Sequence, residues 1–477
     1  MTTSPAVPEQ SIDGDSEPLL LGGIATRTPR SMGVRDPLEG DLVGNVSVAE
    51  RVHVDAAVRS ASESLRRAWP PEERQDVLSR AAEALAADAP AFAHLIAREG
   101  IKTIREARRE VTRAVHTLSM SASAAHAWTE EVSDAGWRAE IRRVPVGVVG
   151  AVTPYNDPLN LVVHKIGPAL AGGNSVVLKP HPQTPLTALR LGNLLLQSGV
   201  PLKRISVLPG GAATGAALIT HPLVRFVTFT GGRAVGLRIA RNLGTRRATL
   251  EMGGVCVTAV GPDYDVSTAA EKLCAGAFAA AGQNCLHVQR VLIHQSVYDR
   301  VVEAFAERAR LLRRGSKLSE DTDVGPMIDR GSAASVHALV TEAVMAGARS
   351  VLGIPWHNDV LYPLTLLERR DSGSRLQDIE AFGPVTMLEP FAAEGDVLAE
   401  INRLDGCLQV GVLTHDLDFA AAIAVGADAG AVVIGDTSDF RVDDLPFGGT
   451  GQSGLGREGI IHAARAMSEP KVVVTSW

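Results

Sequence analysis

The stretch VGVVGAVTPYNDPLNLVVHKIGPALAGGNSVVLKP, residues 146–180, decides the fold class of this 477-residue chain. A β-rich run at 146–152 precedes an apolar helical pattern at 159–170, and a second β-rich run follows at 175–178. A strand, a helix and a strand at this spacing indicate parallel strands joined by a crossover helix. The stretch therefore predicts an α/β fold with a doubly wound, Rossmann-like sheet.

The same alternation continues on both sides of this stretch. Further strands are expected at 205–208 and 226–229, and further helices at 185–197, 214–219 and 233–242. Upstream, residues 51–100 have a helical pattern that ends near Gly100. After Gly254 a second alternation begins, with strands expected at 288–293, 409–413 and 431–434 and a helix at 298–312. This second set predicts another α/β domain with its own core.

The bulk composition excludes several classes of protein. The net charge of -7 is spread along the chain, and no basic stripe with interleaved aromatics suggests a nucleic-acid partner. The four cysteines lack paired spacing, which argues against a disulfide scaffold or a zinc site. The start of the chain does not resemble a secretory signal, and no apolar run is long enough for a membrane span. We expect a cytoplasmic protein, with residues 1–18 as a flexible tail.

Residues at the carboxyl ends of the predicted strands are candidates for ligand binding, because ligands of doubly wound sheets bind there. These are Asn156, Lys179, Gly210 and Gly211, and Gly231 and Gly232. The run FTGG at 229–232 also opens a helix, with Gly236 four residues on. Such a helix N-terminus can admit a pyrophosphate, although the run is not a G-x-G-x-x-G fingerprint.

Three further residues each allow an ordinary structural reading. Cys285, in GQNC at 282–285, is a nucleophile on a glycine turn or a small buried apolar residue. Glu251, in LEMGG at 250–254, is a general base if it is partly buried, or a solvated strand-end residue. Asn156 offers a side-chain amide, or it completes a turn. Each motif is weak alone.

In residue type, order and spacing, these segments together resemble the aldehyde dehydrogenase superfamily, from about Gly22 to Trp477. Two further segments fit the same pattern: IEAFGPV at 379–385, and PFGG at 446–449 followed by SG at 453–454 and GRE at 456–458. The resemblance implies a homodimer or homotetramer with no metal site. It also implies a dinucleotide-binding domain (1–124 and 146–252), a catalytic domain (253–455), and an oligomerisation ribbon with a C-terminal strand (125–145 and 456–477).

The family roles carry over residue by residue. Cys285 would attack the aldehyde carbon, Asn156 and the backbone N–H of Cys285 would hold the oxyanion, and Glu251 would activate the water that hydrolyses the thioester. Lys179 and Glu380 would hold the riboses of NAD or NADP, with Phe382 near the nicotinamide. Further cofactor contacts are expected from Pro154, Tyr155, Gly215, Gly231, Gly232 and Gly236.

Some cofactor-site positions depart from the family pattern. Pro182 stands three places after Lys179, where many NAD-preferring members have a glutamate that binds the adenosine ribose. Loss of that carboxylate removes a repulsion against a 2′-phosphate, so NADP becomes admissible. Gly232 stands where the family often has Ser, and Gly451 where a Lys is common.

The substrate tunnel departs further. Three positions that are commonly aromatic in members acting on apolar aldehydes hold Asp157, His164 and Arg441, and Arg108 matches another position that can face the tunnel. The run DTSDFRVD at 436–443 resembles the branch that includes lactaldehyde and phosphonoacetaldehyde dehydrogenases. We therefore expect a small polar aldehyde, an anionic one included, with Arg441 and Arg108 as anchors. Asp157 argues against a highly charged substrate.

Two alternatives remain at this point. A CoA-acylating semialdehyde dehydrogenase would pass the thioester to CoA, but such members commonly lack the glutamate found here as Glu251. A non-catalytic, aldehyde dehydrogenase-like binding protein should have lost Cys285, Asn156, Glu251 or Lys179, and none of them is lost.

Overall fold

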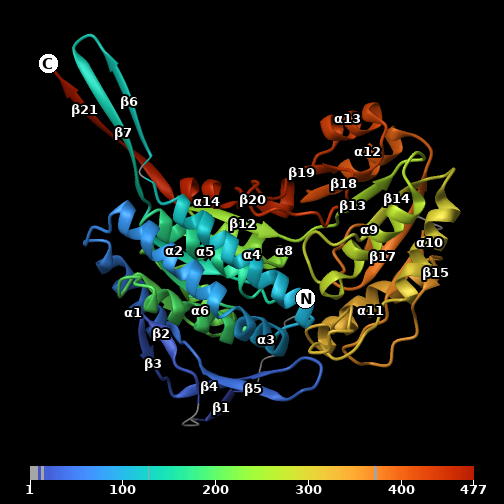
Figure 1. Ribbon diagram of the computed structural model, residues 1–477, viewed down its shortest axis with the longest axis horizontal. Coiled ribbons are helices and arrows are strands. Elements are labelled where there is room, and N and C mark those ends of the chain that lie inside the picture. Colours follow the sequence, from blue (N-terminus) through green and yellow to red (C-terminus); the bar gives the residue numbers. More distant parts are fainter. Residues whose placement is uncertain (1–8, 12–15, 127, 370–372) are drawn as a thin grey trace.

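The computed structural model of the chain describes residues 9–11, 16–126, 128–369 and 373–477. Two α/β lobes lie side by side, and a long ribbon projects from one of them (Figure 1). The lobe with the ribbon contains most of the N-terminal half of the chain, and the other lobe contains residues that follow it (Figure 1).

The first lobe is built on an eight-stranded sheet of order β20-β12-β11-β8-β9-β10-β2-β3. Its parallel strands are β8 (Val148–Val152), β9 (Ser175–Lys179), β10 (Ile205–Val207), β11 (Val224–Gly231) and β12 (Arg247–Met252). Antiparallel strands β2 (Leu19–Leu21), β3 (Ile24–Thr26) and β20 (Gly454–Leu455) complete the edges. The chain reverses its direction across the sheet between β8 and β11, which is where a doubly wound sheet binds its ligand.

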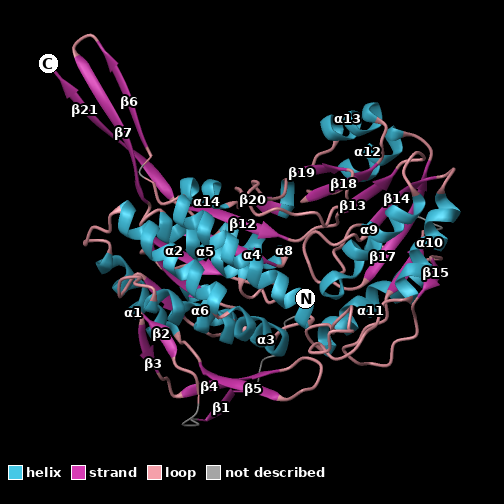
Figure 2. Cartoon of the chain, in the orientation of Figure 1, coloured by secondary structure: helices cyan, strands magenta, loops and turns pink. Residues whose placement is uncertain are grey.

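Helices cover this sheet (Figure 2). They are α1 (Arg51–Ser64), α2 (Pro71–Ala87), α3 (Ala89–Glu99), α4 (Ile104–Ser123), α5 (Asn160–Ala171), α6 (Pro185–Gln197), α7 (Ala212–Ile219) and α8 (Arg233–Arg241). Helix α2 begins at Pro71 because proline fits the first helical position. Every residue of α5 is buried, so this helix lies in the centre of the lobe. Among the described helices, none is both long and apolar enough to cross a membrane.

The second lobe has a seven-stranded sheet of order β15-β16-β17-β14-β13-β18-β19. The strands are β13 (Val257–Val260), β14 (Arg290–His294), β15 (Arg349–Leu352), β16 (Thr365–Glu368), β17 (Val385–Phe391), β18 (Gln409–Leu413) and β19 (Ala431–Ile434). Its helices are α9 (Val266–Phe278), α10 (Tyr298–Arg310), α11 (Arg330–Met345), α12 (Glu394–Asn402) and α13 (Leu417–Gly426). All neighbouring strands are parallel except β15, so the second α/β unit has the expected class.

The ribbon consists of β6 (Thr129–Asp134) and β7 (Trp137–Pro145), and the chain's last strand, β21 (Ser468–Ser476), pairs with β7 over nine residues. Helix α14 (Ile460–Ala466) packs against α5 just before that strand. Val472, Val474 and Trp477 are exposed on β21 and after it. The C-terminal strand therefore completes the ribbon of its own chain.

The expected N-terminal tail is partly wrong. Strand β1 (Glu9–Ser11) pairs antiparallel with β4 (Arg30–Arg35), which in turn pairs with β5 (Leu42–Ser47). Ser16 is buried, and the Glu17 amide donates to the Asn45 carbonyl at 2.7 Å. Strand pairing uses backbone groups, so a polar composition did not prevent it. Residues 1–8 and 12–15 lie outside the described residues.

Candidate active site

A strained loop carries Cys285. Helix α9 ends at Phe278, and Ala280 and Ala281 then take φ values of 50° and 53°, in the left-handed region that alanine rarely adopts. Gly282 follows with φ 68°, and a Cβ atom there would lie 2.2 Å from the Gly383 carbonyl oxygen. Strain of this kind persists only where the surroundings enforce the conformation, and it is common at functional sites.

Buried hydrogen bonds hold this loop. The Glu106 carboxylate accepts a bond from the Ala280 N–H at 2.7 Å. The Gln283 side-chain amide donates to the Ala280 carbonyl at 3.1 Å, and its Oε1 accepts from the Ile328 N–H at 2.9 Å and the Tyr155 hydroxyl at 3.1 Å. Residues from both lobes therefore fix the turn that presents Cys285.

The Cys285 thiol is half-buried beside an apolar cluster. The members of this cluster are Cys256, Leu286, Leu408 and Phe447. Burial raises the pKa of Cys285 to about 12, and the positive charge of Arg441 opposes that rise. Because the thiolate is the nucleophile, a cation close to Cys285 bears directly on reactivity.

Asn156 and Glu251 are buried without the partners that buried polar groups normally have. Among the described residues, the Oδ1 of Asn156 and both carboxylate oxygens of Glu251 lack a hydrogen-bond partner. Glu251 is only 3% exposed, which excludes the reading of a solvated strand-end residue. Burial, reinforced by the charge of Glu458, raises the pKa of Glu251 well above its usual value. Such costly groups are characteristic of active sites.

A buried ion pair behind Glu251 was missed in the sequence analysis. The Lys165 ammonium lies 2.6 Å from Glu458 Oε1 and 3.3 Å from the Thr228 hydroxyl, and both charged side chains are at most 2% exposed. Burial would raise the pKa of Glu458, but Lys165 holds it below its usual value. One signal was available, since Lys165 is the single charged residue in the apolar helix at 160–171 apart from any charge on His164.

The candidate cofactor residues lie at the carboxyl ends of the first sheet. Lys179 ends β9, and a Cβ at Gly215 of α7 would lie 3.4 Å from its Cδ. Burial lowers the pKa of Lys179 to about 8. A Cβ at Gly232, before α8, would meet no described atom within 4 Å, so the space ahead of this helix is open. Gly236 instead packs tightly, because a Cβ there would lie 2.2 Å from Met252 Sδ.

Glu380 faces this sheet from the second lobe. Its carboxylate lies against Gly253, where a Cβ would be 1.9 Å from Oε2, and within the described part of the chain its Oε1 has no hydrogen-bond partner. Burial raises the pKa of Glu380 to about 8, with Arg233 opposing. An open helix N-terminus, a buried cation and a buried carboxylate with a free oxygen fit the phosphates and ribose hydroxyls of a dinucleotide.

Aromatic rings connect the two lobes at the same place. Tyr155 lies edge-on to Phe382 at 5.9 Å and to His181 at 5.1 Å between centroids. Phe382 itself has a φ of 47°. Burial lowers the pKa of His181 to about 3, so this ring is neutral at physiological pH. The Tyr155 hydroxyl donates to Gln283 in this structure. A direct contact of Pro154 and Tyr155 with the cofactor stays a prediction.

Most charges expected in the substrate tunnel are neutralised by partners. Asp157 pairs with Lys102 and lies 3.9 Å from Arg113. Asp443 accepts from Arg113 at 2.8 Å and contacts His164 Nε2 at 2.9 Å. Burial would raise the pKa of Asp443, but these two partners hold it well below its usual value. The negative charge of Asp157, taken from the sequence as an argument against a charged substrate, is therefore compensated.

Arg441 differs from these paired residues. Its side chain is 13% exposed and stacks over the Phe447 ring at 3.7 Å. The nearest carboxylate atoms are those of Asp443 at 3.7 Å and Glu458 at 4.0 Å, which are ion-pair distances rather than hydrogen bonds. Within the described structure its buried Nε has no hydrogen-bond partner. Arg441 thus has donor capacity left for a ligand.

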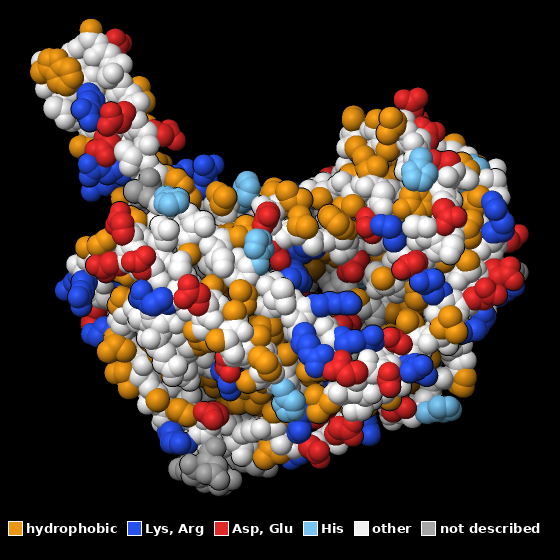
Figure 3. Space-filling model, in the orientation of Figure 1, with side chains coloured by type: hydrophobic (Ala, Val, Ile, Leu, Met, Phe, Trp, Pro, Cys, Tyr) orange, Lys and Arg blue, Asp and Glu red, His pale blue; other side chains and the backbone are white. Residues whose placement is uncertain are grey.

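The structure does not bring Arg108 into this cluster. Its guanidinium is 56% exposed and forms two hydrogen bonds, of 2.6 and 2.9 Å, with the exposed Glu320. The face in Figure 3 is hollowed between the lobes, and Lys and Arg side chains gather beside the hollow. A surface arginine that is already paired is a weaker anchor than Arg441.

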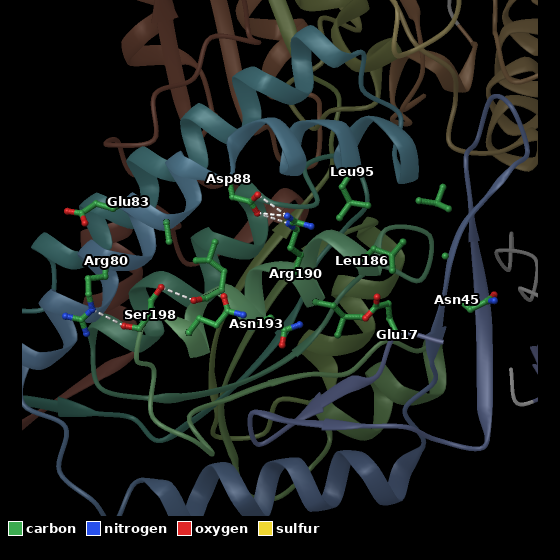
Figure 4. A pocket seen from close by; sticks show the side chains of 16 residues that line it. Glu17, Asn45, Arg80, Glu83, Asp88, Leu95, Leu186, Arg190, Asn193 and Ser198 are labelled. Carbon is green, nitrogen blue, oxygen red and sulfur yellow. Dashed lines mark hydrogen bonds and ion pairs between the residues drawn. The ribbon is translucent and has the colours of Figure 1, made fainter. Parts of the chain in front are cut away.

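A separate groove of about 1150 Å³ lies on the first lobe, lined by α2, α6 and β5 residues (Figure 4). Its arginines are engaged: Arg190 bonds Asp88 at 2.9 and 3.0 Å, and Arg80 donates to the Ser198 carbonyl at 3.1 Å. None of the predicted site residues lines this groove. The candidate active site is therefore the set of residues around Cys285.

Comparison with known proteins agrees with this geometry. The model of the aldehyde dehydrogenase family matches residues 24–473. The chain belongs to the aldehyde dehydrogenase family. The predicted fold class and the prediction of an NAD(P)-dependent aldehyde dehydrogenase are thereby confirmed.

Similar proteins include several that are named for charged aldehydes. The chain is 40% identical to aspartate-semialdehyde dehydrogenase 1 of Pseudomonas canavaninivorans, over 92% of this chain and 95% of that protein. It is 38% identical to 3-sulfolactaldehyde dehydrogenase of Priestia aryabhattai, over 96% and 97%. Among solved structures, glyceraldehyde-3-phosphate dehydrogenase GapN of Methanocaldococcus jannaschii, complexed with NADP, has a TM-score of 0.90 at 32% identity, with 94% and 99% covered.

Proposed function

We propose that this protein oxidises a small polar aldehyde bearing an anionic group to its carboxylic acid, with NAD or NADP as hydride acceptor. The observation that carries the proposal is the half-buried thiol of Cys285 together with two charged side chains close enough to act on its pKa, Arg441 and Glu251. Among the described residues, both carboxylate oxygens of Glu251 and the buried Nε of Arg441 lack a hydrogen-bond partner. Buried polar atoms are normally satisfied, so unpartnered atoms beside one thiol indicate a site that substrate completes.

The first half-reaction uses Cys285 and Asn156. The Cys285 thiol gives its proton to solvent, and the thiolate sulfur adds to the aldehyde carbon, so that the carbonyl oxygen becomes an oxyanion. The side-chain amide of Asn156 and the backbone N–H of Cys285 donate to that oxygen, a contribution often worth about 3 kcal/mol per donor. When bound, NAD or NADP would supply the acceptor for the hydride that leaves the tetrahedral carbon. Re-formation of the carbonyl leaves an acyl thioester on Cys285.

The second half-reaction uses Glu251. Its raised pKa makes the ionised carboxylate a stronger base than an ordinary glutamate. Glu251 takes a proton from water as the water oxygen adds to the thioester carbon. The C–S bond then breaks, the carboxylic acid leaves, and Cys285 is free again. A buried base in this position favours water over CoA as the acyl acceptor.

Lys179 and Glu380 are the residues that would hold the cofactor riboses. Position 182 is proline, so no carboxylate there repels a 2′-phosphate. His181 is neutral, so it adds no positive charge that would attract one. Lys179 supplies the positive charge there. The similar structure from Methanocaldococcus jannaschii contains NADP, which supports NADP as one of the two acceptors.

The anionic substrate is inferred from Arg441. Among the described residues, the buried Nε of Arg441 has no hydrogen-bond partner, while Asp157 and Asp443 are paired. Three of the similar proteins are named for aspartate semialdehyde, 3-sulfolactaldehyde and glyceraldehyde 3-phosphate, each of which has an anionic group. Removal of one partner of a desolvated charge pair costs roughly 2–5 kcal/mol, equivalent to about 30-fold to several thousand-fold in kcat/KM.

The test is formation of reduced cofactor, followed by absorbance with NAD and with NADP. The aldehydes are succinate semialdehyde, phosphonoacetaldehyde, aspartate semialdehyde, lactaldehyde, glycolaldehyde, hexanal and benzaldehyde. We expect anionic aldehydes to be preferred, and Cys285→Ala to abolish turnover. Arg441→Met should lower kcat/KM at least 30-fold for anionic aldehydes and much less for glycolaldehyde, while Arg108→Met, the matched control, leaves both unchanged. A preference for hexanal or benzaldehyde would contradict the proposal.

We also propose that the ribbon joins copies of this chain into a homodimer or homotetramer. The exposed Val472, Val474 and Trp477 lie on or next to a strand at the edge of a three-stranded sheet, where apolar side chains favour association. Sedimentation of the full chain should give the mass of two or four protomers. A monomer at micromolar concentration would argue against this assembly.

A further inference from the structure

Helix α4 contacts both halves of the candidate active site through two glutamates one helical turn apart. We propose that Glu106 and Glu110 are positioning residues that hold the Cys285 loop and the turn after Asn156 in fixed positions relative to each other. This inference rests on the proposed roles of Cys285 and Asn156. Neither glutamate is placed to touch substrate, so both act through the backbone that they bind.

Glu106 binds the loop that precedes Cys285. One carboxylate oxygen accepts from the Ala280 N–H at 2.7 Å. The other accepts from the N–H and hydroxyl of Thr103, at 2.9 and 3.0 Å, and so caps the start of α4. One side chain therefore joins the first turn of the helix to the left-handed segment at Ala280 and Ala281.

Glu110 binds the turn that follows Asn156. Its side chain is buried, and one oxygen accepts from the N–H groups of Leu159 and Asn160, at 2.8 and 3.0 Å. The other oxygen accepts from the Lys102 ammonium at 2.8 Å. These backbone donors are at the start of α5, directly after the segment that carries Asn156. Charge-assisted bonds to backbone N–H groups are short and directional, so they fix this turn.

The two contacts act as a unit because α4 is rigid between them. Residues four apart lie on the same face of a helix, about 6 Å from each other along its axis. The loop before Cys285 cannot rely on its own preference, because alanine disfavours a positive φ. The spacing of thiol and amide thus depends on bonds made by α4. If the two glutamates only stabilised the fold, their replacement would not change the rates of the chemical steps.

The first experiment compares Glu106→Ala with Thr103→Ala, the matched control. Both variants lose capping bonds, but Thr103→Ala leaves the Glu106–Ala280 bond in place. The rate of Cys285 alkylation by iodoacetamide is measured together with kcat, KM and Tm, with Cys285→Ala as the background. We expect Glu106→Ala to lower kcat at least 10-fold. Its alkylation should become severalfold faster at pH 8, because a looser loop relieves the burial that suppresses the thiolate. Thr103→Ala should change both rates less than 2-fold.

The second experiment places Glu110→Ala in two backgrounds. In the wild-type chain we expect kcat/KM to fall at least 10-fold and Tm to fall as well, because Glu110 is also the buried partner of Lys102. In an Asn156→Ala chain the same substitution should cost less than 3-fold, because the group that Glu110 positions is gone.

Equal effects of Glu106→Ala and Thr103→Ala, or an equal loss from Glu110→Ala in both backgrounds, would overturn the inference. The alkylation comparison requires no aldehyde. If the wild-type chain turns over none, the proposed function fails, while the response of the thiol to Glu106→Ala still decides whether α4 sets the position of Cys285.

Discussion

Replacement of Lys165 by methionine tests the electrostatics behind Glu251. The Lys165 ammonium lies 2.6 Å from Glu458 Oε1, and the two side chains are 0% and 2% exposed. The methionine side chain is similar in length, so the change removes the charge and little volume. Removal of one partner of a buried pair leaves an uncompensated charge and costs about 3–5 kcal/mol of unfolding free energy. Lys165→Met/Glu458→Gln removes both charges and should recover much of that loss.

The sign of the pH dependence follows from Glu458. Its pKa is lowered in the folded protein, so its pairing contributes stability above the unfolded pKa of about 4.3 and that contribution is lost as pH falls. Without Lys165 the folded pKa of Glu458 rises, and the carboxyl becomes neutral at acidic pH. The variant should therefore be much less stable than wild type at pH 8 and closer to it at pH 5.

Burial and the negative charge of Glu458 raise the pKa of Glu251, and the positive charge of Lys165 lowers it in part. In Lys165→Met the pKa of Glu251 should rise further, and the rising, acidic limb of the kcat profile should move to higher pH. Denaturant midpoints at pH 5 and 8 and kcat from pH 6 to 10 measure both effects. An equal loss of stability at the two pH values, or an unmoved acidic limb, would refute this reasoning.

Three smaller predictions concern the thiol loop and the cofactor region. Gly282→Ala should abolish turnover and lower Tm, because the added Cβ would lie 2.2 Å from the Gly383 carbonyl oxygen at a φ of 68°. Gly232→Ser should leave Tm unchanged and lower the cofactor KM severalfold, because the site is open and the hydroxyl adds a donor; a lower Tm would contradict the open space. The KM for NADP should rise above pH 8, where Lys179 loses its charge, and Lys179→Met should remove that dependence, as initial rates with fixed aldehyde would show.

Elements with strong local signals were predicted well from the sequence. Helix α6 occupies Pro185–Gln197 as expected, because proline fits its first turn and the apolar residues repeat at helical spacing. The ribbon expected within residues 125–145 is formed by β6 and β7, and the last strand pairs with β7. The short strands β2 to β5 were missed, because three to six residues contain too little periodicity to identify a strand.

The partners of the site residues could not be predicted, because they depend on contacts between distant segments. Asp157 is compensated by Lys102, 55 residues earlier in the chain. Arg108 and Arg441 were equivalent candidates in the sequence, yet one pairs with Glu320 on the surface and the other is half-buried and stacks on Phe447. The left-handed backbone at Ala280 also had no sequence signal, because glycine, not alanine, normally marks such a position.

The charged residues around Glu251 and Arg441 differ in how they are paired, and this difference suits their proposed roles. Asp157, Asp443 and Glu458 each have a cationic or imidazole partner at hydrogen-bond distance. Within the described structure neither carboxylate oxygen of Glu251 has a hydrogen-bond partner, and Arg441 lies 3.7 Å from Asp443 and 4.0 Å from Glu458, which are ion-pair distances without a hydrogen bond. A direct pair between Glu251 and Arg441 would lower the pKa of the carboxyl and weaken it as a base, and it would also occupy the donors that a substrate anion needs. Their separation keeps Glu251 basic for hydrolysis and Arg441 available for substrate.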